Sequence, residues 1–522
     1  MRRLDNQAEI TILEKTNETS IASCGLPYFI GDVISERSAM QVASPAFLKQ
    51  LFDIDVRLNT GVAQINPDEK TVTTENAEVI PYDKLVLALG AKPFVPHVEG
   101  MDLLPCFSVK MLQDADKIKA FISEKKPQKA VVIGGGFIGV EVAENLRHLG
   151  LQTALIEQAS QVLMPLDGDM VAQIHTKMRQ NGIRLYLNNG VQKISQEGVV
   201  LMSGQVVPAD MVIWAIGVRP ETKIAGEAGI QVNERGFIVT NEYMQTNLPD
   251  IYACGDSVSV IDFVSQQQTA IALAGPANRQ GRLIADHIAD NHPYPYTGTQ
   301  GTGIVKVFDL TVAFTGNNEK QLERNKTAYE KMLIMGSSHA GYYPNAEVLT
   351  LKVLYDNQTG KILGAQCIGK EGIDKRIDVI ATIMRLVGTV ADLRDAELCY
   401  APPYSGAKDP INLIGMAIEN VRQGLMKPYF GLDFENMVVV DVRPPQVYAQ
   451  EHIAGAINIP AGQIRSRLHE LPKDKTIMVH CFKGYTSYVV ARILMQNGFE
   501  HVLSYAGGWN FYKSLTSDVN KE

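Results

Sequence analysis

The sequence has little of what several classes of protein require. Only six of its 522 residues are cysteines, and no two of them stand at Cys-x-x-Cys spacing. That excludes a disulfide scaffold and argues against a zinc site. The ten histidines show no metal-ligand spacing either, so no metal is expected. The longest apolar runs, such as Leu85–Leu89, are far shorter than the ~18–20 residues that cross a bilayer.

A signal peptide and an excess of positive charge are also missing. Polar residues begin at Asp5, before an apolar core can form, so we expect a cytoplasmic protein without a membrane partner. Lysine and arginine number 49 against 57 acidic residues, a net charge of −8 that disfavours nucleic acid as a main partner. The chain exceeds the ~250–300 residues of a single core, so several domains are expected.

Residues 129–157 carry the first motif that is present: a strand, a glycine turn, a helix and a second strand. Gly134, Gly136 and Gly139 stand at Gly-x-Gly-x-x-Gly spacing, and Glu157 ends the second strand. Such glycines let the backbone approach a pyrophosphate at a helix N-terminus, while the carboxylate binds a ribose 2′-hydroxyl. The pattern predicts a dinucleotide site that prefers NADH to NADPH, because the carboxylate repels a 2′-phosphate. The alternative is a glycine turn without a ligand.

The start of the chain resembles only the end of that unit. Arg3–Glu14 is similar to His148–Glu157, and if Glu14 corresponds to Glu157 the partner glycines would lie about nine residues before Met1. We therefore expect the chain as written to lack a first strand and its glycine turn. A form extended upstream is expected to hold a flavin better and to be more stable. The alternative is a protein that binds flavin poorly.

Two further strands end in residues that suit a flavin. Tyr82–Gly90 ends at a glycine, and Thr246–Asp256 ends in Gly-Asp, whose carboxylate is placed to accept a hydrogen bond from a ribitol chain. A simple helix cap by Asp256 is the alternative. From about Gly301 the pattern changes to strands followed by helices, which indicates an α+β module. A linker, Lys427–Asp433, precedes a last unit of roughly ninety residues.

Three short runs are more specific: Ser20-Ile-Ala-Ser-Cys24-Gly-Leu-Pro-Tyr28, His339-Ala-Gly-Tyr342-Tyr-Pro and Tyr400-Ala-Pro-Pro-Tyr404-Ser. With the motifs above, they resemble the flavoprotein disulfide reductases that have two dinucleotide domains. The nearest branch is CoA-disulfide reductase, including rhodanese-fused forms that act on CoA persulfide and polysulfide. Ile21, Ser23 and Asn345 replace the family's usual Phe, Asn and Gly, which bears on substrate preference more than on reaction class.

The resemblance implies an α/β fold with two Rossmann-like dinucleotide-binding domains, the first lacking its first strand and glycine turn. An α+β dimerisation domain and a C-terminal α/β rhodanese domain would follow, and a homodimer is implied. The expected domains are residues 1–110 with 233–300 for FAD, 111–232 for NADH, 301–425 for dimerisation and 433–522 for the rhodanese domain.

Cys24 is the expected redox centre. Many disulfide reductases carry a second cysteine five positions on, but that position is Phe29 here, so Cys24 must form its mixed disulfide with the substrate. An adjacent helix N-terminus favours the reactive thiolate. The alternative is a small buried residue, which is our interpretation of Cys106, Cys254, Cys367 and Cys399.

The resemblance also assigns binding residues. Tyr342 and Tyr400 would reach the site from the other subunit and donate a hydrogen bond to the departing thiolate, unless they only pack at an interface. CoA would be held by Arg3, Ser20, Asn278 and Lys408. FAD and NADH would be held by Glu14, Lys15, Val62, Gly90, Gly134, Gly136, Gly139, Glu141, Glu157, Gly217, Gly255, Asp256 and Ala274.

The last unit resembles a rhodanese domain through Val438–Arg443, Glu451–Pro460 and Met478–Ser487. Its loop begins at Cys481, and backbone N–H groups of such a loop stabilise a thiolate or persulfide. A phosphatase would need an arginine where Ser487 stands, so that class is excluded, and Lys483 adds positive charge. The alternative is an inactive rhodanese fold that serves only for docking.

The resemblance therefore implies FAD- and NADH-dependent reduction of CoA persulfide, polysulfide or CoA disulfide by Cys24. Cys481 would carry sulfane sulfur to CoA or another thiol. Two alternatives stay open. One is an NADH oxidase or peroxidase that uses a sulfenic acid at Cys24, and the other is a sulfur-trafficking protein without flavin.

Overall fold

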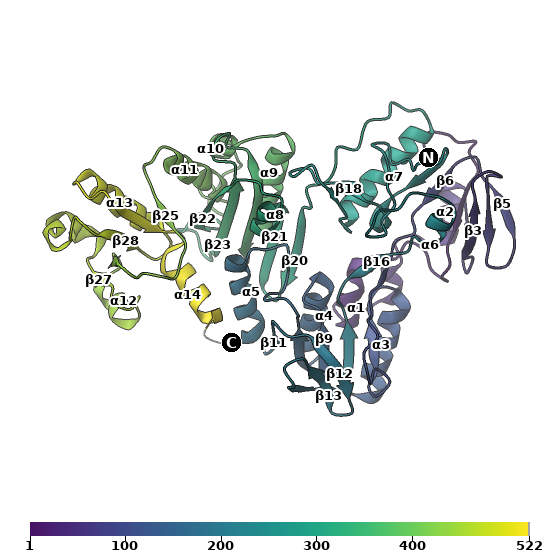
Figure 1. The fold of residues 1–522 in the computed structure, drawn as a ribbon, viewed down its shortest axis with the longest axis horizontal. Coiled ribbons are helices and arrows are strands. Elements are labelled where there is room, and N and C mark those ends of the chain that lie inside the picture. Colours follow the sequence, from purple (N-terminus) through teal and green to yellow (C-terminus); the bar gives the residue numbers. More distant parts are fainter. Residues whose placement is uncertain (520–522) are drawn as a thin grey trace. The chain divides into compact units, whose positions relative to one another are not determined.

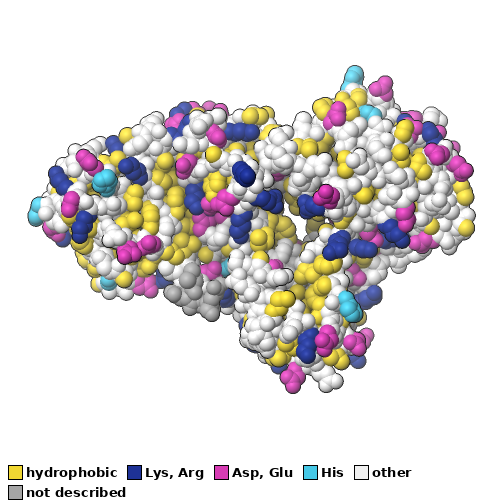
Figure 2. Space-filling model, viewed as in Figure 1, with side chains coloured by type: hydrophobic (Ala, Val, Ile, Leu, Met, Phe, Trp, Pro, Cys, Tyr) yellow, Lys and Arg dark blue, Asp and Glu magenta, His cyan; other side chains and the backbone are white. Residues whose placement is uncertain are grey.

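The structure, a computed structural model, describes residues 1–519 (Figure 1). It divides into two compact units. Unit 1 combines Met1–Leu163 with Met178–Gly301, and unit 2 combines Met164–Lys177 with the chain from Thr302 onward. Within the described range, no helix has both the length and the apolar character needed to cross a membrane. Acidic and basic side chains lie across the face drawn in Figure 2, with apolar ones between them.

A five-stranded parallel sheet forms the centre of one part of unit 1, in the order β11-β10-β9-β15-β8. Its strands are β8 (Cys106–Ser108), β9 (Lys129–Ile133), β10 (Gln152–Ile156), β11 (Arg184–Tyr186) and β15 (Met211–Trp214). Helices α3 (Leu112–Lys125) and α4 (Phe137–His148) follow β8 and β9. The central strands are almost continuously apolar and buried, because a parallel sheet is covered on both faces.

An antiparallel sheet packs against that parallel sheet. It consists of β12 (Val191–Ser195), β13 (Gly198–Leu201) and β14 (Val206–Pro208). Ile194, Val199 and Val207 belong to one buried cluster with Val131 and Ile156 of the parallel strands. The antiparallel sheet therefore contributes to the apolar core beside the parallel sheet.

The rest of unit 1 contains two separate pairs of parallel strands, β1 (Ile10–Leu13) with β2 (Ile54–Arg57) and β6 (Leu85–Leu87) with β17 (Ile251–Ala253). Antiparallel strands complete it: β3 (Val62–Asn66), β4 (Thr71–Thr74), β5 (Val79–Pro81), β7 (Ala91–Pro93), β16 (Val218–Pro220), β18 (Val260–Ile261) and β19 (Gln268–Thr269). The helices are α1 (Leu26–Ile30), α2 (Pro45–Phe52), α6 (Lys223–Glu227) and α7 (Ala274–Ile288).

Unit 2 begins with an antiparallel sheet in the order β20-β21-β24-β23-β22. Its strands are β20 (Gly303–Val307), β21 (Leu310–Gly316), β22 (Glu330–Ser337), β23 (Val348–Tyr355) and β24 (Ile362–Gly369). The helices of this part are α8 (Glu319–Arg324), α9 (Ile373–Arg385), α10 (Val390–Asp395) and α11 (Pro410–Arg422). Helix α5 (Gly168–Gln180) also belongs to unit 2 as far as Lys177.

The last part of unit 2 is a parallel sheet in the order β25-β29-β28-β26-β27. Its strands are β25 (Pro428–Tyr429), β26 (Met437–Asp441), β27 (Ile457–Asn458), β28 (Thr476–His480) and β29 (Val502–Tyr505), and its helices are α12 (Pro445–Gln450), α13 (Tyr485–Gln496) and α14 (Gly508–Val519). The first residues of the expected linker, Pro428 and Tyr429, therefore pair with β29 as an edge strand. The elements confirm the predicted α/β fold with an α+β module before the last unit.

A buried ionic cluster joins residues 164–177 to the antiparallel sheet of unit 2. The Lys352 side chain on β23 is fully buried and contacts Asp167 at 2.9 Å, Asp169 at 2.7 Å and Glu319. Burial alone would raise the pKa of Glu319, but Lys352 and Lys331 outweigh it and lower that pKa from 4.5 to about 2. Burial opposes the charge of Lys352, but the three carboxylates raise its pKa. Lys352 and Glu319 are therefore charged at neutral pH. Burial raises the pKa of Asp167, although Lys352 opposes that shift.

We predict that Lys352→Met destabilises unit 2 by about 3–5 kcal/mol, because the buried Asp167 and the half-buried Asp169 lose Lys352 as their cation and Glu319 keeps only Lys331. The measurement is the thermal unfolding midpoint. The deficit should shrink between pH 7 and pH 5, since protons then replace the missing cation on the carboxylates. In the wild type, Glu319 contributes stability above its ordinary pKa of 4.5 and loses it as the pH falls towards 2.

Lys370→Met is the matched control. Lys370 also pairs with two acidic residues, Glu347 and Asp309, but its side chain is 44% exposed. An exposed pair contributes little, so this change should leave the midpoint nearly unchanged. Equal effects of the two substitutions would show that the buried cluster has no special part in stability.

Candidate functional site

The glycine turn after β9 has the geometry that a dinucleotide needs. Gly134 has φ +108°, and a Cβ there would lie 2.4 Å from the Ala215 carbonyl oxygen. A Cβ on Gly139 would lie 1.9 Å from the Gly134 carbonyl oxygen, so α4 can approach the strand only with glycine there. Gly136 precedes α4, and its Cβ position has no neighbour within 4 Å. The turn is thus tight on its inner side and open where a diphosphate would approach.

Glu157 lies beside the same turn. One of its carboxylate oxygens accepts a hydrogen bond from the Gly135 N–H at 2.7 Å, and the other accepts from the Ala159 N–H at 2.8 Å. These two bonds fix the carboxylate at the carboxyl end of β10. Each oxygen keeps a second lone pair, which a ribose hydroxyl could use. Gly217, after β15, has φ +101° and open space at its Cβ position.

Cys24 lies in a 3-10 turn, Ser23–Gly25, directly before α1, and is exposed. The structure thus disagrees with a buried structural role for this residue. Phe29, where a second thiol would stand, is in the core with 3% exposure. None of the six cysteines, all of which the structure describes, forms a disulfide.

Helix α1 packs against α4, the helix that follows the glycine turn. The Tyr28 hydroxyl donates a hydrogen bond to the Glu141 carboxylate at 3.0 Å. Burial raises the pKa of Tyr28, and the Glu141 charge raises it further, so the phenol stays protonated as the donor. The predicted cofactor residue Glu141 on α4 therefore contacts α1, the helix that follows the Cys24 turn.

Three of the predicted flavin residues, Gly90, Gly255 and Asp256, follow the paired strands β6 and β17. Gly90 and Gly255 follow these strands with φ +67° and +78°, and a Cβ at either would meet nothing within 4 Å. Asp256 forms an ion pair with Lys110 at 3.2 Å. Two open glycines beside a carboxylate suit the sugar-like chain of a flavin. The residues present therefore fit this part of FAD.

The other predicted flavin residues belong to the same unit. Glu14 follows β1 and accepts a hydrogen bond from the Thr16 N–H at 2.8 Å, while Lys15 pairs with Glu221 at 2.9 Å. Val62 begins β3 and Ala274 begins α7. Three of the predicted CoA residues, Arg3, Ser20 and Asn278, are exposed in unit 1, whereas Lys408 is exposed in unit 2.

The structure brings Tyr342 and Tyr400 together. Their hydroxyl oxygens lie 2.9 Å apart, and both side chains are exposed. The hydrogen bond from Tyr400 raises the pKa of Tyr342. Cys399, next to Tyr400, is also exposed, so our interpretation of it as a buried residue is wrong: it lies in the loop before α11 instead of inside an element. Cys106 and Cys254 are half-buried, and Cys367 is buried.

The Cys481 loop joins β28 to α13. Cys481 is only 5% exposed, and the Gly484 N–H donates to its Sγ at 3.2 Å. The carbonyls of Cys481 and Phe482 accept hydrogen bonds from the N–H groups of Trp509 and Asn510, at 2.7 and 3.1 Å. Because α14 holds the loop carbonyls outward, the loop N–H groups are left for an anion, as in other anion-binding turns.

A buried charged layer under this loop was missed by the sequence analysis. Asp441 and Arg443, both fully buried, pair at 2.6 Å, and the Arg443 guanidinium lies 4.3 Å from the Trp509 ring centre. Burial lowers the pKa of His480 to about 4, so that ring is neutral at pH 7. The sequence contains a signal for this layer, because the two charged residues Asp441 and Arg443 follow the apolar run Val438–Val440.

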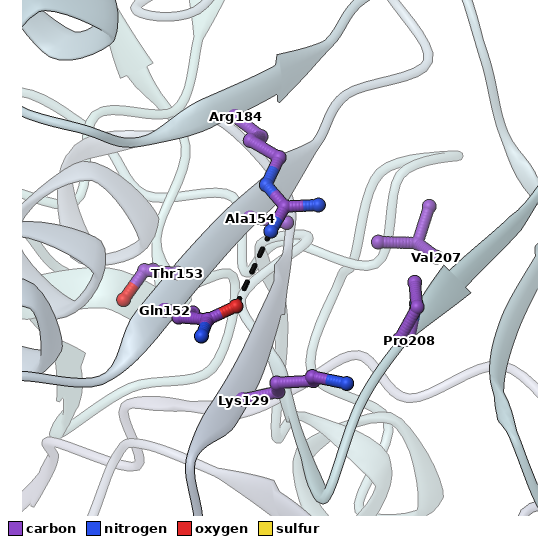
Figure 3. Close-up of a pocket in the computed structure, with 7 residues that line it drawn as sticks. All are labelled: Lys129, Gln152, Thr153, Ala154, Arg184, Val207 and Pro208. Carbon is purple, nitrogen blue, oxygen red and sulfur yellow. Dashed lines mark hydrogen bonds between the residues drawn. The ribbon is translucent and has the colours of Figure 1, made fainter.

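A separate pocket of about 160 Å³ lies at the amino-terminal edge of the parallel sheet in unit 1 (Figure 3). The Arg184 guanidinium bonds to Gln152 across it at 3.3 Å. It is lined by Lys129, Gln152, Thr153, Ala154, Arg184, Val207 and Pro208. Ligands of such sheets bind at the carboxyl ends of the strands, so this pocket is not the dinucleotide site.

Three families match the chain. Pyridine nucleotide-disulphide oxidoreductase matches residues 1–281, the dimerisation domain of the same class matches 302–410, and the rhodanese-like domain matches 431–515. Coenzyme A disulfide reductase from Staphylococcus haemolyticus is 35% identical over 420 residues, which are 80% of this chain and 94% of that protein.

Two solved structures match nearly the whole chain. Reduced CoADR-RHD from Bacillus anthracis is 44% identical with a TM-score of 0.96, over 99% of this chain and 95% of that one. A NAD-dependent persulfide reductase from A. fulgidus is 34% identical with a TM-score of 0.94, over 98% and 96%. The chain therefore belongs to the pyridine nucleotide-disulphide oxidoreductase family, whose members depend on FAD and NAD(H), and it carries a rhodanese-like domain after its dimerisation domain.

Proposed function

We propose that this chain uses NADH and FAD to reduce CoA persulfide, polysulfide or CoA disulfide, and that its rhodanese-like domain transfers sulfane sulfur. The observation that carries the proposal is the pair of thiols: Cys24 is exposed without a second cysteine, and Cys481 is buried in an anion-binding loop. A lone thiol next to a flavin exchanges with a sulfur substrate. The named relatives, a coenzyme A disulfide reductase and a persulfide reductase, support this substrate class.

We assign the work to four domains: 1–110 with 233–300 for FAD, 111–232 for NADH, 301–425 for dimerisation and 433–522 for sulfur transfer. The antiparallel sheet of unit 2 lies within 301–425, which supports that boundary. The edge strand β25 extends the last sheet upstream to Pro428. The linker between the last two domains is then only a few residues long.

Most of the residues that would hold the cofactors lie in the turns after strands or at the start of the helices that follow them. For NADH these are Gly134, Gly136, Gly139, Glu141, Glu157 and Gly217. For FAD they are Glu14, Lys15, Val62, Gly90, Gly255, Asp256 and Ala274. FAD held there would supply the chemistry that takes up a hydride from NADH and passes two electrons to the sulfur centre.

Cys24 carries out the reduction. Its thiolate attacks the S–S bond of the substrate, forms a mixed disulfide and releases hydrosulfide or a CoA thiolate. Two electrons then break the S–S bond of the mixed disulfide, which gives back the Cys24 thiolate and releases the rest of the substrate as a second thiolate. Tyr342 and Tyr400 donate a hydrogen bond to the departing thiolate. The hydrogen bond between the two hydroxyls raises the pKa of Tyr342, so this phenol keeps its proton as a donor. By the resemblance, the tyrosine pair of one subunit acts on Cys24 of the other in a homodimer.

CoA is the proposed ligand of Arg3, Ser20, Asn278 and Lys408. All four are exposed, and two are basic, which a phosphate-bearing ligand requires on a chain of net charge −8. The cytoplasm suits this function, because a reducing compartment keeps both Cys24 and Cys481 as thiols.

Two observations weigh against the alternatives. An NADH oxidase has no use for a sulfur-transfer loop, yet Gly484 donates to Cys481 as such a loop requires. A flavin-free protein has no use for open glycines beside a carboxylate, yet Gly90, Gly255 and Asp256 have that arrangement.

We predict that Cys24→Ser lowers NADH-dependent reduction of CoA persulfide and CoA disulfide to background, because no second cysteine can replace the thiolate. Sulfur transfer from thiosulfate to a thiol should be unchanged. NADH oxidation followed by absorbance measures the first activity. The matched control is Cys399→Ser, which removes another exposed cysteine and should keep both activities. Full reduction by Cys24→Ser would overturn the single-cysteine mechanism.

Cys481→Ala should have the opposite effect. We expect it to abolish thiosulfate-to-thiol sulfur transfer and to leave reduction of added CoA disulfide nearly unchanged, because the parallel sheet that carries Cys481 has its own core. Sulfite release and NADH oxidation, assayed on the same preparation, separate the two activities. A large loss of disulfide reduction would mean that the last domain shapes the reductase site.

The proposed preference for NADH depends on the charge of Glu157. Glu157→Ala should reduce the preference for NADH over NADPH by about tenfold or more, which is what one charge-assisted hydrogen bond contributes. Ratios of kcat/KM for the two nucleotides give the measurement. Glu157→Gln is the control, because it keeps an oxygen for the Gly135 N–H but removes the charge. Equal use of both nucleotides by the wild type would show that the assignment is wrong.

A further inference from the structure

Two buried serines lie behind the sulfur atom of Cys481. The Sγ of Cys481 is 3.7 Å from the hydroxyl oxygen of Ser487, on the first turn of α13. That oxygen is 3.1 Å from the hydroxyl oxygen of Ser504 on β29. Ser487 has 0% exposure and Ser504 has 3%, so water does not reach either hydroxyl freely. The three side chains form a short buried line that begins at the sulfur.

The number of available hydrogens determines which group donates and which accepts in each of these hydrogen bonds. A serine hydroxyl has one hydrogen to donate and two lone pairs that accept. The Ser487 hydroxyl donates its hydrogen to the Gly484 carbonyl at 2.8 Å. It therefore accepts from both remaining neighbours, the thiol of Cys481 and the hydroxyl of Ser504. This arrangement belongs to the protonated thiol.

A thiolate at Cys481 has the opposite hydrogen-bonding requirement from the thiol. It has no hydrogen to donate and requires donors, of which the Gly484 N–H at 3.2 Å is one. The Ser487 hydrogen can become the second by turning from the Gly484 carbonyl to Sγ. Ser504 keeps donating to the Ser487 oxygen in both states, so its hydrogen bond polarises the Ser487 hydroxyl towards the sulfur.

We propose that Ser487 is a catalytic residue of sulfur transfer, which donates a hydrogen bond to the Cys481 thiolate, and that Ser504 positions it. This inference rests on the proposed sulfurtransferase function. In the first step the Cys481 thiolate attacks the outer sulfur of thiosulfate. A bond from Sγ to that sulfur forms, the S–S bond of thiosulfate breaks, and sulfite leaves with the electron pair.

In the second step an acceptor thiolate attacks the terminal sulfur of the Cys481 persulfide. The new S–S bond belongs to the acceptor, the bond to Sγ breaks, and Cys481 leaves as a thiolate with the electron pair. Ser487 stabilises the thiolate at both ends of this cycle. When the sulfur is protonated, the hydroxyl turns back to the Gly484 carbonyl.

The test measures the reactivity of the thiolate without any sulfur substrate. Full-length protein is treated with iodoacetamide at pH 7, and labelling of the peptide that contains Cys481 is followed by mass spectrometry. Ser487→Ala should slow the labelling about tenfold, the effect of losing one hydrogen bond to a charged group. Ser504→Ala should slow it about threefold, because a bond between neutral groups is weaker.

Ser514→Ala is the matched control. The Ser514 hydroxyl also donates to the carbonyl three residues earlier, Phe511, at 2.7 Å, but has no thiol beside it. This change should leave labelling at the wild-type rate. If Ser487→Ala lowers the unfolding midpoint, the labelling rate of Ser504→Ala decides whether the inference holds. The Ser504 hydroxyl does not touch the sulfur, so its removal leaves the surroundings of Cys481 intact.

The outcomes separate this inference from the function it rests on. Wild-type labelling rates in both Ser487→Ala and Ser504→Ala would overturn the serine pair and leave the proposed function standing. Sulfur transfer that survives Cys481→Ala would instead overturn the proposed function. Slower labelling in both serine variants, with an unchanged Ser514→Ala, supports the inference.

Discussion

A parallel strand that turns directly into a helix leaves backbone N–H groups without partners in the fold, and two of the candidate sites of this chain, the dinucleotide motif and the Cys481 loop, are built on such a turn. The first is the turn from β9 to α4 at Gly134–Gly136, and the second is the turn from β28 to α13 that begins at Cys481. Each is held by contacts too close for a side chain. A Cβ on Gly139 would lie 1.9 Å from a carbonyl oxygen of the first turn, and one on Gly508 would lie 2.5 Å from the Cys481 carbonyl oxygen.

The two turns serve different chemistry because of what surrounds them. The first is open at Gly136, as a long dinucleotide requires. The second is covered: Cys481 is 5% exposed, α14 donates hydrogen bonds to the carbonyls of its loop, and the buried hydroxyl of Ser487 lies 3.7 Å from the sulfur. Burial of this kind stabilises a charged persulfide that is hydrogen-bonded, because exclusion of water strengthens each hydrogen bond to its charge. The net charge of −8 therefore says little about either site, where local N–H groups do the binding.

Ion pairs also fix the position of residues 164–177, which follow the glycine-turn motif in the sequence. Residues 164–177 leave unit 1 and attach to the sheet of unit 2 through Asp167 and Asp169, which meet Lys352 with Glu319. Apolar contacts alone would tolerate several positions of this segment. A fully buried lysine is satisfied only when its carboxylates arrive together, so the cluster favours one arrangement.

The sequence by itself determined the local units of this protein. A strand, a glycine turn and an acidic residue lie close together along the chain, so their spacing predicted the turn at Gly134, while the resemblance to a rhodanese domain indicated the loop at Cys481. The short runs around Cys24 and Tyr400 indicated the family, and the residue at position 29 excluded a second thiol. These inferences succeed because the geometry of a strand–turn–helix is set by neighbours in sequence.

Contacts between distant segments were decided only by the tertiary structure. Cys399 is exposed although its sequence surroundings are apolar, because it lies in a loop. Ser504 meets Ser487 only because β29 pairs with β28, and Lys352 meets Asp167 only because residues 164–177 pack against β23. The order of strands in a sheet depends on how whole faces of the sheet and helices pack against one another. The spacing of residues along a single strand or helix therefore does not predict that order.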